Sequence, residues 1–181
     1  MKTLEDQMSF YAAYHQDARN KATHFIGVPM IAFSLMIPLG WLRVDFGATT
    51  VTAALVVTSL LLLYYLILDV PLGLASCAVF ALMLWGADTL SQLPLMASLA
   101  WFLALFVAGW ALQLWGHVYE GRKPALVDNL FQVFVAPIFL AAEVFFALGY
   151  KPGLHEAVQR RAMQMRAQAG LGNQSGSLTS A

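Results

Sequence analysis

The sequence predicts an all-α integral membrane protein, and three observations support this class. Of the 181 residues, 60% are apolar and only 11% are charged, against about 25% charged residues in soluble domains. The mean hydropathy is +0.67.

Ten basic and ten acidic residues cancel, so a nucleic-acid partner has no electrostatic support. The single cysteine, Cys77, excludes an intramolecular disulfide and a cysteine-based zinc site.

The apolar residues gather in runs that we interpret as about four transmembrane helices. A short amphipathic helix over residues 3–15 comes first, with Thr3 as its cap. The first 22 residues contain no apolar core of a signal peptide, so we expect the first span to direct membrane insertion. The predicted spans are residues 25–42, 50–68, 72–86 and 95–115.

The last apolar run, residues 131–149, is interrupted by Pro137 and contains an acidic residue. Basic residues place the N-terminal segment, the 118–129 loop and the C-terminal tail in the cytoplasm. Because another full crossing would reverse the tail, this run is predicted to be a re-entrant or interfacial helical hairpin. A second amphipathic helix follows. Residues 1–168 therefore form one helical membrane domain, and the Gly/Ser-rich residues 169–181 are predicted to be disordered.

The functional signal is concentrated in residues 110–129, where an apolar run turns abruptly polar. Gln113, His117 and Glu120 follow i, i+4, i+7 spacing and share one face of a helix. The predicted topology brings His15 and His24 to the same cytoplasmic level, and a turn between them would let them converge. Three imidazoles suit zinc, iron or copper. Histidines at a membrane interface also serve as polar anchors, and this alternative stays open.

Three other charged residues have two interpretations each. Glu143 either accepts a hydrogen bond from a histidine N–H or pairs with Arg122 or Lys123. Arg122 and Lys123 either anchor the cytoplasmic side or bind the carboxylate of a lipid substrate.

Two separated motifs carry a resemblance to a known family. The matching residues are Tyr14, His15, Asn20, His24, Val28 and Pro29, then Gly109, Trp110, Gln113, Gly116, His117, Glu120, Lys123, Pro124, Ala125, Leu126, Asp128 and Asn129, continued by Pro137, Glu143, Leu148 and Gly149. Over residues 9–152 the chain resembles the membrane 2-hydroxy fatty acid dioxygenases, typified by the fungal endoplasmic-reticulum enzyme of phytosphingosine breakdown. The fungal motif carries a further histidine at the position of Gln16.

The resemblance implies an Fe²⁺-dependent α-oxidation. A 2-hydroxy fatty acid and O₂ would give CO₂ and the fatty acid one carbon shorter. The family histidines required for activity correspond to His15, His24 and His117, which we interpret as the iron ligands, with Glu120 or Glu143 orienting a ligand. The remaining expected site residues are Asp128 beside the ligands and Asn20, Gln113, Arg122, Lys123 and Asn129 for substrate binding.

Two alternatives of other classes remain. One is a non-enzymatic membrane lipid-binding or scaffold protein, and the other is a different metal-dependent lipid-modifying enzyme. Four histidines are too few for the clusters of membrane desaturases, and no G-x-S-x-G elbow is present. We expect a multi-pass protein with its site at the cytoplasmic side, in a bacterial inner membrane in preference to the endoplasmic reticulum. Homo-oligomer formation is left open.

Overall fold

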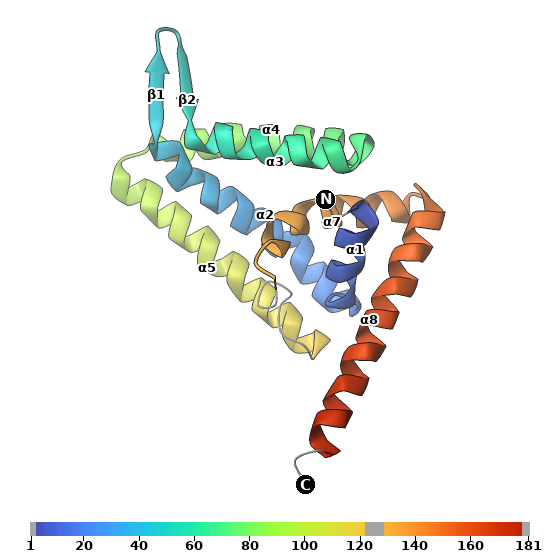
Figure 1. The fold of residues 1–181 in the computed structure, drawn as a ribbon. Coiled ribbons are helices and arrows are strands. Elements are labelled where there is room, and N and C mark those ends of the chain that lie inside the picture. Colours follow the sequence, from blue (N-terminus) through green and yellow to red (C-terminus); the bar gives the residue numbers. More distant parts are fainter. Residues whose placement is uncertain (1–2, 122–128, 179–181) are drawn as a thin grey trace.

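The computed structural model describes the backbone of residues 3–121 and 129–178 and the side chains up to residue 169. Within these ranges the protein is helical apart from one small hairpin of strands, which confirms the predicted all-α class (Figure 1). The elements are α1 (Leu4–Ala13), α2 (Ala18–Trp41), β1 (Arg43–Phe46), β2 (Thr49–Thr52), α3 (Ala53–Leu68), α4 (Val70–Ser91), α5 (Leu95–Glu120), α7 (Gln132–Ala147) and α8 (Pro152–Leu178).

Helices α2 and α5 form the central antiparallel pair. At one end Trp41 of α2 donates a hydrogen bond of 2.9 Å to Ser98 of α5. Glycines let the two backbones approach closely elsewhere: a Cβ on Gly109 would lie 2.7 Å from Ile31, and one on Gly116 would lie 2.2 Å from Thr23. Small residues at such a seam are typical of helix pairs in membranes. The seam fixes the end of α5 beside the start of α2, where the predicted site residues lie.

The other helices surround this pair. Helices α3 and α4 pack together, α7 contacts α4 and α1, and α8 packs along α1 (Figure 1). A shared core of buried side chains joins these elements and includes Met8, Ile37, Tyr65, Phe139 and Val158. The N-terminal helix is therefore part of the folded body.

The outer faces of α3, α4 and α5 carry large exposed apolar side chains, among them Leu60, Ile67, Leu82, Trp85 and Val107. Lipid covers surfaces of this kind in membrane proteins. Helices α2, α4 and α5 are long and apolar enough to cross a membrane. Helices α3 and α7, with 16 residues each, would measure about 24 Å, against a hydrocarbon core of about 30 Å. The expected count of four spans is therefore not confirmed.

The second and third predicted spans differ from the helices observed. Residues 43–52, expected to be a loop and the start of a span, form the antiparallel β1–β2 hairpin. The β-branched run Thr49–Thr52 favours a strand, and Gly47 adopts φ +64 in the two-residue turn. As a result α3 begins only at Ala53, after the Thr52 cap.

Helix α4 is longer than the predicted span 72–86 and continues to Ser91. The expected loop from Asp88 was wrong because the polar residues there have a partner. The Arg43 guanidinium lies 3.2 Å from Asp88 and 2.8 Å from the Ser91 hydroxyl. These two contacts give the polar side chains at the end of α4 a hydrogen-bond partner.

The predicted break near Pro137 was also wrong, because α7 is one continuous helix with Pro137 inside it. A proline within a helix removes one backbone donor but need not end the helix where packing supports it. The next helix, α8, ends at Leu178. It therefore includes part of the segment 169–181, for which the sequence predicts disorder.

Candidate metal centre

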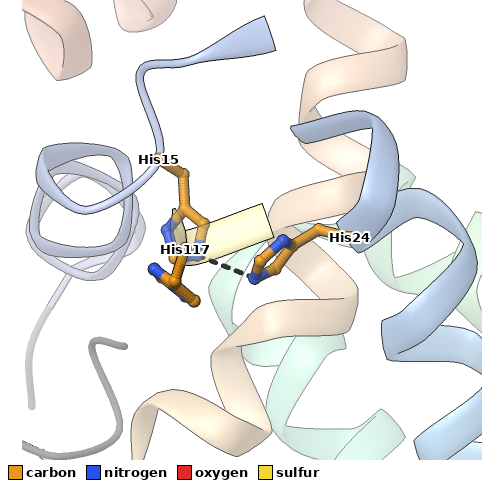
Figure 2. Close-up of side chains that lie close together, drawn as sticks. All are labelled: His15, His24 and His117. Carbon is orange, nitrogen blue, oxygen red and sulfur yellow. Dashed lines mark hydrogen bonds between the residues drawn. The ribbon is translucent and has the colours of Figure 1, made fainter. Parts of the chain in front are cut away.

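The three predicted histidines converge. His15 lies in the turn after α1, His24 in the second turn of α2 and His117 in the last turn of α5, and all three are buried. One potential ligand nitrogen from each lies within 4.8 Å of those of the other two. Their rings meet edge to face, with centroids 4.4 to 5.1 Å apart (Figure 2). The fourth histidine, His155, instead stacks on Phe146.

Local folding brings His15 and His24 together across nine residues. The Thr3 capping box starts α1, and Asp17 starts α2 by accepting hydrogen bonds from the Arg19 and Asn20 backbone N–H groups. The short turn between the two helices reverses the chain, as the sequence predicted. His15 therefore faces His24 directly.

The ring orientations favour a bound cation. Nδ1 of His15 lies 2.8 Å from the Tyr11 carbonyl oxygen, and Nδ1 of His24 lies 2.8 Å from the Asn20 carbonyl oxygen. A carbonyl oxygen can only accept a hydrogen bond, so each Nδ1 carries the proton and each Nε2 presents a lone pair. These two Nε2 atoms are 3.0 Å apart, which places two acceptors face to face. A metal ion bound by both Nε2 atoms would replace this repulsion with coordination. Metal-binding imidazoles are typically oriented in this way by an acceptor at their other ring nitrogen, here the two backbone carbonyls.

The surroundings of His15 keep it neutral. The Tyr11 ring stacks on it at 4.0 Å. Burial, followed by the influence of His24, holds the pKa of His15 well below its usual value, so the neutral form that binds metals dominates at pH 7. Burial also raises the pKa of the Tyr11 phenol. The residues present therefore fit a divalent first-row metal ion.

Glu120 connects the segments that carry the histidines. Its Oε2 accepts hydrogen bonds from the backbone N–H groups of Gln16 and Asp17, at 2.9 and 2.8 Å, and from the Asn20 amide at 3.1 Å. Its Oε1 accepts one from Arg166. None of these four partners is an imidazole, so Glu120 contacts the histidine-bearing turns through their backbone and through Asn20.

The histidines lie at one end of a cavity of about 360 Å³ whose wall is otherwise almost entirely apolar. Two buried glutamines also line it. Gln113 Nε2 has no hydrogen-bond partner within the described protein, and neither Nε2 nor Oε1 of Gln132 has one. Gln113 Nε2 would lie 2.9 Å from a Cβ at Gly27, so the glycine leaves room for this amide. Buried amides without partners are costly and suggest a polar ligand.

Several predicted site residues lie elsewhere. Glu143 pairs with Lys21 at 2.7 Å, and among the described residues no histidine is its ion-pair partner. Asn129 does not line the cavity, and its side chain accepts a hydrogen bond from the Phe131 backbone N–H at the start of α7. Asn20 also lies outside the cavity lining and donates to Glu120 and to the Tyr14 carbonyl. Arg122, Lys123 and Asp128 fall outside the described residues.

Sequence reasoning missed three contributors. Tyr11 was not among the expected site residues, although its i, i+4 spacing to His15 predicts contact on a helix. Gln132 is a polar residue at the start of an apolar helix, which was a usable signal. Arg166 gave no local signal, because its partner Glu120 lies 46 residues away. The Gln16 side chain, at the position of the extra fungal histidine, points toward α8 and donates to Gln159.

Comparisons with known proteins identify the family of the chain. The profile of the family described as 2-hydroxy-palmitic acid dioxygenase Mpo1-like matches residues 1–148. The chain is 36% identical over 159 residues to the 2-hydroxy-palmitic acid dioxygenase MPO1 of Saccharomyces cerevisiae, covering 86% of this chain and 87% of the yeast protein. No solved structure matches. The chain therefore belongs to the Mpo1-like family of 2-hydroxy-palmitic acid dioxygenases.

Proposed function

We propose that the protein is an Fe²⁺-dependent membrane dioxygenase that converts a 2-hydroxy fatty acid and O₂ into the fatty acid one carbon shorter, CO₂ and water. One observation carries the proposal: three buried histidines converge at one end of a long apolar cavity. The name of the yeast relative supports both the reaction class and the 2-hydroxy acid substrate.

His15, His24 and His117 would hold the iron. The Tyr11 and Asn20 carbonyls keep two of the imidazoles in the tautomer that presents Nε2. Three protein ligands leave positions open for substrate and O₂. Bound Fe²⁺ would supply the one-electron chemistry that a spin-paired organic acid lacks toward O₂.

The cavity suits a long acyl chain. Its lining on α2 runs from His24 to Leu39, a rise of about 22 Å at 1.5 Å per residue. This length exceeds half of a bilayer core, which measures about 15 Å. Walls from α3, α4 and α7, including Leu61, Phe80 and Phe134, complete the apolar enclosure. The chain would lie between the helices with its polar head toward the histidines.

The two glutamine amides would receive that head. Gln113 Nε2–H can donate to a carboxylate, and Gln132 offers both a donor and an acceptor, which matches a carboxylate beside a hydroxyl group. Water is largely excluded by the apolar wall, so each of these hydrogen bonds gains strength. Arg122 and Lys123 would assist the entry of the acid from the cytoplasmic leaflet, where we place the site. The bacterial inner membrane remains our proposed location.

Metal content of the anaerobically purified protein tests the proposal. We expect close to one iron per chain in the wild type and in His155→Ala, and little in His117→Ala. The His155 variant is a matched control because that ring lies outside the cluster. Iron-loaded wild type should consume O₂ with 2-hydroxy-palmitic acid and release the shortened acid. The absence of metal from protected wild type would instead favour a lipid-binding or scaffold protein, and zinc would indicate another lipid-modifying enzyme.

A further inference from the structure

Helix α8 lies beyond the residues that the family profile matches, which end at 148. It nevertheless reaches the turn that carries His15. Arg166 Nη1 donates to the Ala13 carbonyl oxygen at 3.1 Å and to Glu120 Oε1 at 2.5 Å. Gln159, on the same helix, accepts a hydrogen bond from the Gln16 side chain at 3.2 Å. A helix that the family profile does not reach therefore contacts both sides of that turn.

The carboxylate that Arg166 holds reaches all three histidine-bearing segments. Glu120 stands three residues after His117 in the last turn of α5. Its other oxygen holds the backbone immediately after His15 and the side chain of Asn20, whose carbonyl oxygen fixes the His24 ring. A displacement of this one carboxylate would move all three ligands relative to one another.

Charge makes Arg166 important to that carboxylate. The Glu120 side chain is only 1% exposed, and a buried carboxylate is costly without a paired cation. The other described basic residues from Lys151 onward have acidic partners elsewhere: Lys151 pairs with Asp69, Arg160 with Glu156, and Arg161 with Asp6 and Glu5. Among the described residues, Arg166 is the cation that pairs with Glu120.

We propose that Arg166 is a positioning residue for the metal centre: from α8 it holds Glu120, and through Glu120 it sets the spacing of His15, His24 and His117. The inference rests on the proposed function, because it assumes that the histidines bind a metal. The inference gives α8, which the family profile does not reach, a role in metal affinity.

Titration of the metal-free full-length protein with Co²⁺, followed by its visible absorption under anaerobic conditions in detergent, tests the inference. We expect Arg166→Gln to weaken Co²⁺ binding about ten- to a hundredfold, as for other residues that orient metal ligands. Arg161→Gln is the matched control. It removes ion pairs that join α8 to α1 without touching Glu120, and should leave the Kd for Co²⁺ unchanged.

A second comparison separates positioning from general support of the fold. If Arg166 acts through Glu120, the double variant Glu120→Gln/Arg166→Gln should bind Co²⁺ no more weakly than Glu120→Gln alone. Additive losses, or an equal loss in Arg161→Gln, would overturn the inference. Should Arg166→Gln fail to fold, Arg166→Lys is measured; it should show a smaller loss, since lysine lacks the guanidinium geometry, and a wild-type Kd would overturn the inference.

The two proposals fail differently in this experiment. Wild-type protein that does not bind Co²⁺ would remove the metal centre, and the inference with it. Wild-type binding that Arg166→Gln leaves unchanged would remove only the role of Arg166, and the proposed function would stand.

Discussion

The two ends of the α2–α5 helix pair are both polar, but their polar groups are satisfied to different degrees. At the hairpin end Trp41 donates to Ser98, and Arg43 donates to the Gly40 carbonyl, Asp88 and Ser91. At the histidine end, two imidazole lone pairs face each other at 3.0 Å. Two glutamines there also keep amide atoms that have no hydrogen-bond partner among the described residues.

The difference separates structural from functional polarity. Buried polar groups in proteins are nearly always hydrogen-bonded, because an unmet group costs about 1–3 kcal/mol. The hairpin end meets this rule within the protein and serves to close the helix pair. The histidine end leaves groups that the described residues do not satisfy, which is expected of a binding site.

Replacing one residue at each end should have opposite consequences, and this is the largest effect we expect. His24→Ala should abolish iron binding and turnover while the protein stays folded, because one of three ligands is lost. Arg43→Gln should retain iron and turnover but lower the Tm, since each lost hydrogen bond contributes about 1 kcal/mol. Iron analysis, O₂ consumption and thermal unfolding in detergent measure both variants. Full activity in His24→Ala would break the comparison.

The glycine seam should matter most near the histidines. A Cβ in Gly116→Ala would lie 2.2 Å from Thr23 Oγ1 and 2.5 Å from Asn20 Oδ1. We expect a loss of about 1–3 kcal/mol in the free energy of unfolding together with weaker iron binding, because Asn20 fixes His24. Gly153→Ala is the control, since nothing lies within 4 Å of its added Cβ. A Gly116→Ala protein with wild-type Tm and iron affinity would contradict the packing described for the seam.

Gln132 offers a smaller and more diagnostic test. Leucine has a similar size and no polar atoms, so Gln132→Leu should raise the Tm by removing a buried amide that no described residue satisfies. The same change should raise the KM for a 2-hydroxy acid about tenfold, which corresponds to about 1.4 kcal/mol. Steady-state kinetics on the iron-loaded enzyme gives the KM. A lower Tm with an unchanged KM would mean that Gln132 supports the structure and does not bind substrate.

The smallest expected effect concerns a structural ion pair. Lys151 pairs with the buried Asp69, and this hydrogen bond raises the pKa of Lys151. Its contribution to stability is therefore complete below the unfolded-state pKa of about 10.4 and is lost as the pH rises through the higher folded-state pKa. Thermal unfolding across this alkaline range should show a decline that Lys151→Gln lacks. An identical decline in both proteins would assign it to other groups.

Local spacing predicted the face of α5 that contributes to the candidate site. The i, i+4, i+7 pattern of Gln113, His117 and Glu120 depends only on helix geometry, and Asp17 was recognisable as a helix cap. These features are encoded over a few residues. Bringing His15 and His24 to His117 depended in addition on the predicted membrane topology, whose four spans are not confirmed.

Long-range partners were not predictable in the same way. The extension of α4 depends on Arg43, which lies 45 residues before Asp88. Glu143 was expected either to accept from a histidine N–H or to pair with Arg122 or Lys123, and it pairs with Lys21, 122 residues away. Such pairings follow from how the helices assemble, and one sequence contains no signal that selects among distant cations. The contact of Arg166 with Glu120, 46 residues apart, was not predictable for the same reason.

The separation of the ligands along the chain has a consequence for biosynthesis. His15 and His24 leave the ribosome early, whereas His117 and Glu120 follow about 100 residues later, and Arg166 later still. Chains are made from the N-terminus at about 5–20 residues per second, so the first two histidines wait for several seconds without their partners. We expect metal capture to be the last step of maturation, so a truncated or stalled chain would carry no reactive centre into the membrane.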